Sequence, residues 1–309
     1  MSTDRVQVSV VVPILDGADT VTELHRRLAP ALDALGSPYE VILVDDGSRD
    51  GTWPIICDLA SREPHVRGLR LAANAGHPAA VAAGFDAAEG AVVAMIDVDL
   101  ETYPEDLPGL IQAVENGADL ASGRRTARRR WDRELGSHLF NARARRAGIE
   151  LHDVGCGMNA MRASLAKQYA GSGNLRRTLV KPHLLSYADD VVEVPVRSVR
   201  PKGSHLGIGD LVTFWLEFDV VHRRPPWGRV AVLGLVALAL AGALAVAAAL
   251  GWDPSEGAWL AIASLGIGLV AALLVALGLL AGLLLKGLES LGSPFYRVAD
   301  RVGWPEAGC

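Results

Sequence analysis

Cysteine is scarce in this sequence of 309 residues. It occurs at three positions only, namely Cys57, Cys156 and Cys309. Their spacing matches no zinc-binding pattern, so we interpret them as structural or incidental thiols. An excess of basic residues is lacking too: the 30 Lys and Arg and 35 Asp and Glu give a net charge of -5, which does not indicate nucleic-acid binding. A signal peptide is not expected, since the apolar run Val6–Val12 is short and gives way to Pro13 and Asp16.

Charge is absent from two long stretches, residues 230–252 and residues 258–285. Each is longer than the roughly 20 residues that a helix needs to cross a bilayer. Tryptophans stand near their ends, where interfacial aromatic residues are enriched, at Trp227, Trp252 and Trp259. We therefore predict two transmembrane helices. The alternative is one very hydrophobic buried hairpin.

The charges that flank these stretches predict an orientation in the membrane. Basic residues lie on the outer sides of the pair, at Arg223, Arg224, Arg229 and Lys286. The connecting loop has Asp253 and Glu256 but no Lys or Arg. Because basic residues favour the cytoplasmic side, we expect a multi-pass protein of the inner (plasma) membrane with both termini and the N-terminal domain in the cytoplasm. The expected parts are a domain over 1–210, an amphipathic juxtamembrane linker over 211–228, a transmembrane hairpin over 229–286 and a cytoplasmic tail over 287–309.

The N-terminal domain alternates short apolar runs with segments of helical periodicity. The predicted strands are Val6–Pro13, Tyr39–Val44, Val66–Leu71, Ala91–Ile96 and Asp119–Ser122. The predicted helices are Val21–Leu35, Thr52–Glu63, Ala79–Ala88 and Glu105–Glu115. Such alternation predicts an α/β fold with a mostly parallel sheet and helices on both faces.

Three acidic residues follow the fourth predicted strand, at Asp97, Asp99 and Glu101. Residues i, i+2 and i+4 of an extended segment point the same way, so these carboxylates can converge. Carboxylates that lie so close to one another repel unless a cation lies between them. Mg²⁺ and Mn²⁺ prefer such oxygen ligands. Taken alone, the pattern fits an acidic turn after a strand better than a metal site.

Two other predicted strands also end in residues of interest, Pro13 and the pair Asp45-Asp46. In open parallel sheets ligands bind outside the carboxyl ends of the strands. The three strand ends therefore predict one shared site, although Asp46-Gly47 is also a good turn dipeptide.

Four motifs in order give the chain a family resemblance: VVVPILDGADTV, VDDGSRDGT, NAGHPAAVAAGFDAAEG and DVDLETYPEDL. Together they resemble the inverting glycosyltransferases of family 2, which have a GT-A fold. Within that family the chain is most similar to polyprenyl-phosphate glycosyltransferases, some of which have two C-terminal membrane spans. The resemblance covers roughly residues 8–204 and implies a GT-A domain followed by two transmembrane helices.

The resemblance also implies roles on the donor side. The residues that match nucleotide-sugar-binding positions are Pro13, Asp16, Asp45, Asp46 and Asp97. Those that match metal positions are Asp97, Asp99 and Glu101, with Asp99 also matching a catalytic position. At the position of Glu101 the subfamily usually has Gln, so a carboxylate there can tighten the metal and repel the donor diphosphate. His77 fits the third motif, and we do not assign it proton transfer.

On the acceptor side, Arg200, Lys202 and Ser204 match the subfamily's phosphate-binding element, and we expect the two cations to act in catalysis as well. Arg124 opens the basic run 124–130, which is either a solvated face or a loop over anionic substrates. Asp153 matches a position that serves as general base in relatives acting on hydroxyls. For a phosphate acceptor a structural role is expected.

The resemblance, together with the two uncharged stretches, implies a membrane-anchored, Mg²⁺- or Mn²⁺-dependent enzyme that moves a sugar from a UDP- or GDP-linked donor to a polyprenyl phosphate, with inversion. One alternative is a glycosyltransferase acting on a hydroxyl of a glycolipid or polysaccharide, although the Q-x-x-R-W element of processive synthases is missing. Another is a catalytically silent membrane scaffold that binds nucleotide sugar. Glycine and alanine along both predicted spans permit close helix packing and a homo-oligomer.

Overall fold

The computed structural model describes residues 6–126, 151–153, 155–172, 180–199 and 296–304, together with parts of 234–280. The chain forms two compact units. The first consists of Met1–Glu217 and Gly292–Cys309, and the second of Phe218–Leu291.

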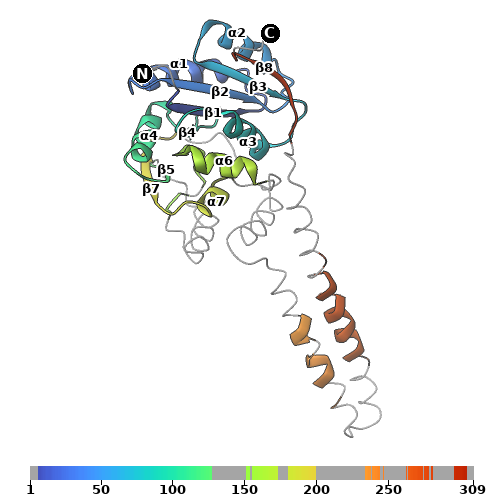
Figure 1. Ribbon diagram of the computed structural model, residues 1–309. Coiled ribbons are helices and arrows are strands. Elements are labelled where there is room, and N and C mark those ends of the chain that lie inside the picture. The colour runs from blue at the N-terminus through green and yellow to red at the C-terminus, as the bar shows by residue number, and fades with distance from the viewer. Residues whose placement is uncertain are drawn as a thin grey trace. The chain divides into compact units, whose positions relative to one another are not determined.

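The first unit contains an eight-stranded sheet within the described ranges, in the order β7-β5-β6-β4-β1-β2-β3-β8 (Figure 1). The strands are β1 (Val8–Ile14), β2 (Tyr39–Asp45), β3 (Val66–Leu71), β4 (Val92–Met95), β5 (Leu120–Arg125), β6 (Asn159–Arg162), β7 (Val191–Val196) and β8 (Val298–Val302). Strand pairs β1–β2, β1–β4, β2–β3 and β5–β7 are parallel, whereas β6 and β8 run antiparallel to their neighbours. The prediction of an α/β fold with a mostly parallel sheet is confirmed.

Helices cover both faces of this sheet. They are α1 (Val21–Asp33), α2 (Thr52–Arg62), α3 (His77–Ala87), the short 3₁₀ helix η1 (Pro104–Asp106), α4 (Leu107–Glu115), α6 (Ala163–Gly171) and α7 (Val180–Leu185). One apolar core joins the sheet to α1, α2 and α4, and a second core joins the opposite face to α3, α6 and α7. Every residue of β1 is buried, as expected for a strand between two helical layers.

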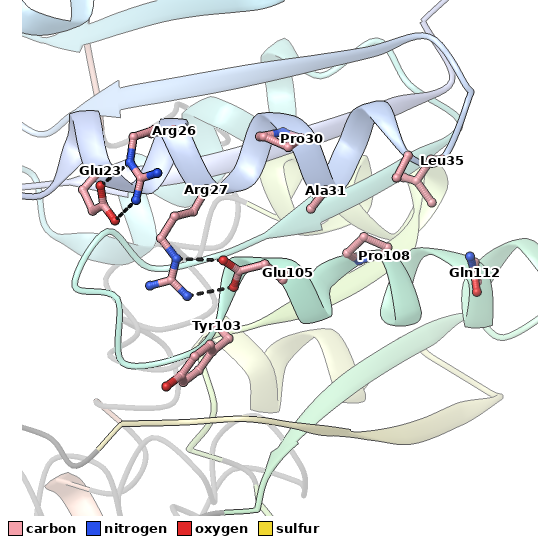
Figure 2. Close-up of a pocket in the computed structure, with 11 residues that line it drawn as sticks. Glu23, Arg26, Arg27, Pro30, Ala31, Leu35, Tyr103, Glu105, Pro108 and Gln112 are labelled. Atoms are coloured by element: carbon pink, nitrogen blue, oxygen red, sulfur yellow. Dashed lines mark hydrogen bonds and ion pairs between the residues drawn. The ribbon is translucent and has the colours of Figure 1, made fainter.

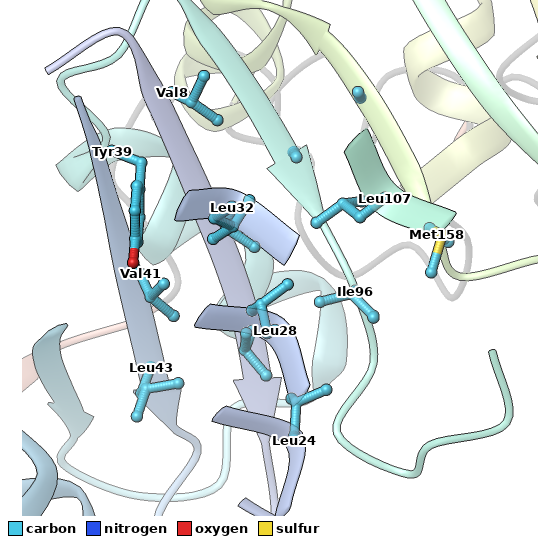
Figure 3. Close-up of a cluster of buried hydrophobic side chains, with 14 of the residues drawn as sticks. Val8, Leu24, Leu28, Leu32, Tyr39, Val41, Leu43, Ile96, Leu107 and Met158 are labelled. Carbon is cyan, nitrogen blue, oxygen red and sulfur yellow. The ribbon is translucent and has the colours of Figure 1, made fainter. Parts of the chain in front are cut away.

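The first core shows how the sequence pattern produces the packing. Leu24, Leu28 and Leu32 of α1 recur at helical spacing and are fully buried against β1 and β2, next to Val41 and Leu43 (Figure 3). Each side chain of this size contributes about 1.5–3 kcal/mol when it leaves water. The strands and helices predicted between residues 6 and 122 are all present, with ends displaced by a few residues.

Strand β8 was not expected, because the sequence predicts a cytoplasmic tail for 287–309. It pairs antiparallel with β3, with Gly68 opposite Val302. Beyond it, Gly303 adopts a positive φ of 85° and Trp304 packs over the guanidinium of Arg67 at 5.4 Å from the ring centre. The sequence pattern that would predict β8 is weak because β8 is an edge strand. Its three central residues are exposed, so it lacks an apolar run.

In the second unit, the described helical residues lie within 234–246 and 262–280. Glycines allow these stretches to lie close to one another, since a Cβ on Gly234 would meet Val275 at 2.5 Å and one on Gly268 would meet Ala241 at 3.8 Å. Eleven large apolar side chains of these stretches are exposed, with exposed fractions of 55–75%. Within the described residues, no helix combines the length and the apolarity that crossing a bilayer requires. Much of the hairpin predicted at 229–286 lies outside those residues.

Candidate active site

The parallel strands bring the predicted donor motifs to one edge of the sheet. Ile14, the last residue of β1, lies opposite Asp45, the last residue of β2, and Met95 at the end of β4 lies opposite Val11. The prediction that these three strand ends share an edge is confirmed. Pro13 itself is buried inside β1, so its contact with a nucleotide stays a prediction.

The loop after β1 is fastened to the loop after β2 by backbone N–H groups. Asp16 has a positive φ of 50°, which aspartate tolerates, and its N–H donates to Ser48 Oγ at 2.9 Å. In return, the N–H of Arg49 donates to Asp16 Oδ1 at 2.9 Å. Asp16 therefore helps to shape this part of the site.

The two adjacent aspartates at the end of β2 have different environments. Asp45 is fully buried: its Oδ1 accepts the N–H of Ser48 at 2.9 Å, and its Oδ2 lies 3.3 Å from Arg70 Nε without hydrogen-bond geometry. That oxygen is itself buried, so its partner in the structure is the charge of Arg70, and the predicted contact of Asp45 with a nucleotide stays a prediction. Asp46 instead uses both oxygens on backbone N–H groups, of Ala75 at 2.7 Å and of Gly76 at 2.9 Å. Burial raises the pKa of Asp46, while these two N–H groups act in the opposite direction.

Asp46 thereby fixes the turn that begins α3 and presents His77. The Nε2 atom of His77 lies 3.1 Å from Asp97 Oδ1. Partial burial opposes protonation of the imidazole, but the hydrogen bond and charge of Asp97 and nearby carboxylates outweigh it and raise the pKa of His77. A hydrogen-bonded partner of this kind orients a carboxylate that binds metal.

The loop that contains Asp97 and Asp99 is unusual in its backbone. Leu100 has a positive φ of 58°, which is rare for a non-glycine residue and concentrates at functional sites. Burial, followed by the charge of Asp97, raises the pKa of Asp99. The N–H of Glu101 donates to Asp99 Oδ1 at 2.9 Å and acts in the opposite direction. Two adjacent ionised carboxylates are thus unfavourable here unless a cation is added.

Gly157, at the start of the segment that leads into β6, lies against the Asp97 carboxylate. A Cβ atom at this position would stand 1.7 Å from Asp97 Oδ2, closer than any real contact. The absence of a side chain at Gly157 therefore leaves the space that the carboxylate occupies. Gly157 belongs to the segment D-V-G-C-G-M-N, and no role for this glycine was expected from the sequence.

The residues present fit a divalent ion in part. Asp97 and Asp99 provide hard oxygen ligands, and the raised pKa of Asp99 favours a cation. Within the described residues, no group of three or more His, Cys, Asp or Glu side chains lies close enough to hold a metal ion. The protein side of such a site is therefore incomplete, and oxygens of a bound diphosphate are suited to complete it.

Glu101, the third predicted ligand, faces Arg125 at the end of β5. Its Oε2 lies 3.6 Å from Arg125 Nη1. The same guanidinium binds Asp153, with Nε 2.8 Å from Oδ2 and Nη2 3.0 Å from Oδ1. Arg124, the residue of this run that we predicted near the anionic substrates, is exposed next to Arg125. The run 124–130 contains several arginines, and no spacing within it indicates which one meets Asp153.

Asp153 is held firmly from several directions. The side chain is 7% exposed, and the backbone N–H of Arg125 also donates to its Oδ2 at 3.1 Å. Its own N–H donates to Glu193 Oε1 at 3.0 Å, and its carbonyl accepts from the buried Lys181 Nζ at 3.1 Å. Burial alone would raise the pKa of Asp153, but the hydrogen bonds and charge of Arg125 hold it below the usual value. Glu193 and Lys181 were not expected from the sequence.

A short antiparallel contact joins the acidic loop to the segment after β7. Val199 N–H donates to the carbonyl of Glu101 at 2.9 Å, and Thr102 pairs with Ser198. Val199 is the last described residue before Arg200 in the sequence. The predicted acceptor residues Arg200, Lys202 and Ser204 lie outside the described residues.

A groove of about 840 Å³ lies elsewhere on the first unit, between α1 and the segment from Tyr103 to Gln112. Figure 2 shows Arg27 of α1 paired with both oxygens of Glu105 across this groove, each at 2.8 Å. None of the predicted site residues that the structure describes lines it. The chemistry is therefore assigned to the strand ends and not to this groove.

An α/β sheet with acidic residues at the ends of neighbouring parallel strands, two of them suited to a divalent ion, is the arrangement of a GT-A glycosyltransferase. The family model "Glycosyl transferase family 2" matches residues 9–170. The chain belongs to this family and is a glycosyltransferase, as predicted.

Relatives and solved structures agree with this assignment. The chain is 32% identical to the undecaprenyl-phosphate 4-deoxy-4-formamido-L-arabinose transferase of Edwardsiella ictaluri, over 77% of this chain and 75% of the relative. The same identity is found with the enzyme of that name from Aeromonas hydrophila, over 76% and 73%. Glucosyl-3-phosphoglycerate synthase from Mycobacterium tuberculosis, solved with Mn²⁺, UDP-glucose and phosphoglyceric acid, has a TM-score of 0.54 at 21% identity, covering 70% of this chain and 79% of that one. This likeness shows the GT-A fold.

Proposed function

We propose that this protein transfers a sugar from a nucleoside-diphosphate sugar to a polyprenyl phosphate of the undecaprenyl type, with inversion at the anomeric carbon. The names of its relatives support the acceptor, since they act on undecaprenyl phosphate. Solved structures that share its fold contain Mn²⁺ with UDP or UDP-glucose, which supports a UDP-linked donor and a divalent metal.

The observation that favours a phosphate acceptor is that Asp153 is bound by Arg125 and has a lowered pKa. A sugar hydroxyl needs a general base to take its proton, whereas a phosphate monoester is already ionised near neutral pH. Both oxygens of Asp153 are bound by Arg125, and the pKa of Asp153 is lowered. A carboxylate held in this way is a weak base, so the described geometry suits an acceptor that requires none.

The donor is assigned to the shared edge of β1, β2 and β4. Asp97 and Asp99 would hold Mg²⁺ or Mn²⁺, which neutralises the departing diphosphate when bound. His77 and Gly157 keep the Asp97 carboxylate in place, and Asp45 at the end of β2 shapes the neighbouring loop through its bond to Ser48. On the acceptor side, Arg200 and Lys202 are proposed to hold the lipid phosphate in line for attack.

Membrane anchoring is part of the same proposal. The described residues of the second unit expose eleven large apolar side chains and place Gly and Ala between the two helical stretches. Large exposed apolar surface marks contact with lipid or another protein, and small residues allow membrane helices to approach closely. We propose that residues 229–286 form the two spans, with the first unit and both termini on the cytoplasmic side of the inner (plasma) membrane.

A screen of UDP- and GDP-linked sugars tests this function. Purified full-length protein in membrane vesicles with undecaprenyl phosphate and Mn²⁺ should move radiolabel into an acid-labile, organic-extractable lipid. Excess chelator should abolish transfer, and Asp99→Asn should lower the rate by about two or more orders of magnitude. Wild-type transfer in chelator contradicts the metal site. Transfer to a glycolipid hydroxyl but not to the lipid phosphate contradicts the acceptor.

A further inference from the structure

Arg125 stands between two carboxylates that hold it with unequal strength. Toward Asp153 it makes two side-chain hydrogen bonds of 2.8 and 3.0 Å to a carboxylate that is almost fully buried. Toward Glu101 the closest pair of atoms is 3.6 Å apart, which is an ion pair but too long for a hydrogen bond. Glu101 is also the more exposed partner, at 31% against 7%.

Asp153 therefore holds one edge of the guanidinium firmly, whereas the edge that faces Glu101 is held weakly enough for another anion to replace Glu101. An arginine has five N–H donors in a planar fork, of which Nε–H and one Nη2–H are used by Asp153. Gly155 keeps the space beside Nη2 open, since a Cβ there would stand 3.2 Å away. The Nη1 edge faces Glu101, two residues from Asp99 and next to the loop contact with Val199. Such an edge is suited to bidentate binding of phosphate oxygens.

We infer that Glu101 is a specificity-determining residue that competes with phosphate oxygens for Arg125. With no anion present, its carboxylate occupies the exchangeable edge of the guanidinium. A phosphate group that enters must displace the carboxylate and overcome its negative charge. Glu101 therefore weakens the binding of phosphate, and this role replaces the metal-ligand role that its position in the sequence suggests. The inference rests on the proposed function for the identity of the anion, which is either the lipid phosphate or the donor diphosphate.

The size of the expected change in phosphate affinity follows from the charge of the Glu101 carboxylate. Partly exposed ion pairs contribute modestly, and removal of one like charge next to an anion adds a comparable amount, so Glu101→Gln should tighten phosphate binding roughly threefold to tenfold. The glutamine keeps the length and shape of the side chain. Because the Glu101 side chain is partly exposed, the substitution is expected to be tolerated by the fold.

Equilibrium binding to the full-length protein in detergent tests the inference without turnover. Inorganic phosphate and a short-chain prenyl phosphate represent the acceptor, and UDP represents the donor, each titrated with and without Mn²⁺. Glu101→Gln should tighten one or both classes of probe roughly threefold to tenfold and leave the Kd for Mn²⁺ within about threefold. The matched control is Glu105→Gln, which removes a carboxylate from Arg27 outside the site and should change neither.

A double-mutant cycle separates competition for Arg125 from a general change of charge. Arg125→Lys keeps the positive charge near Asp153 but lacks the second edge, so Glu101→Gln should have a much smaller effect in that background. Tightening of the prenyl phosphate alone assigns the edge to the acceptor, and tightening of UDP alone assigns it to the donor. The inference is overturned if phosphate and UDP bind unchanged, if the effect is equal in the Arg125→Lys background, or if Mn²⁺ affinity falls tenfold or more. Because these measurements need no transfer, they stand even if the acceptor proposal fails.

Discussion

Replacing Gly157 by alanine should disable the metal site without unfolding the protein. The added Cβ would stand 1.7 Å from Asp97 Oδ2 and 2.6 Å from its Cγ. Contacts under 3.0 Å essentially never occur, so the carboxylate must move by more than about 1 Å, which disturbs its 3.1 Å contact with His77. Gly157 does not have a positive φ, and alanine therefore fits its backbone without strain.

The magnitude follows from what the displaced carboxylate does. Misplacing a group that holds a metal ligand costs about 10- to 100-fold in metal affinity, and loss of an electrostatic contact to the leaving group costs about 10²- to 10³-fold in rate. Stability should change little, because only the end of one side chain has to rotate. We expect a difference of less than about 1.5 kcal/mol in the free energy of unfolding.

The assay combines Mn²⁺ titration in the presence of UDP, thermal unfolding in the absence of metal, and transfer of radiolabelled sugar. Gly109→Ala is the matched control, since its Cβ would meet only Val194 at 3.7 Å and alanine favours the helix by about 0.5–1 kcal/mol. That variant should bind Mn²⁺ like the wild type. Normal Mn²⁺ affinity and normal transfer in Gly157→Ala would refute the placement of Asp97 at the metal.

Three further predictions concern the acceptor, pH and the C-terminal strand. Arg200→Ala should raise the KM for polyprenyl phosphate and leave nucleotide-sugar binding nearly intact; an essential Asp153 with a dispensable Arg200 would indicate a hydroxyl acceptor instead. The folded pKa of Asp153 is lowered, so its pair with Arg125 stabilises the fold above the unfolded pKa of 3.8 and is lost as pH falls through the folded value. In denaturant unfolding, Asp153→Asn should therefore be less stable than wild type by about 1–3 kcal/mol at neutral pH. This difference in the free energy of unfolding should close below about pH 4. A difference that does not change with pH would contradict the pairing. Deletion of residues 296–309 should lower stability by about 2–4 kcal/mol because Val302 and Trp304 lose their contacts, whereas deletion of 305–309 should not; equal melting temperatures would exclude a stabilising role for β8.

Much of the fold follows from local pattern. Strands β1, β2 and β4 were predicted because buried parallel strands appear as short apolar runs, and the convergence of Asp45 and Asp97 follows from the rule that parallel strands end at one edge. A turn at Asp46-Gly47, the alternative to a nucleotide contact, is present as well, since Gly47 has a positive φ of 75°. Each of these features depends on residues that are close in sequence.

The remaining features depend on polar contacts between distant residues, which leave no periodic signal. Arg125 and Asp153 are 28 residues apart, and His77 and Asp97 are 20 apart. Which arginine of a basic run meets a given aspartate depends on backbone geometry that only the folded chain defines. The same holds for Gly157, since a glycine in the sequence does not show which side chain occupies the space it leaves.

The pairing of β3 with β8 has a consequence for how the domain folds during synthesis. Gly68 lies opposite Val302, so the outer edge of β3 stays unpaired until the chain has been made as far as β8. An unpaired strand edge can join another chain, and contacts so distant in sequence form late because a long loop must close first. At a synthesis rate of about 5–20 residues per second, this exposure lasts on the order of ten seconds or more. The nascent N-terminal domain is therefore expected to depend on chaperones or on rapid completion of the chain during this interval.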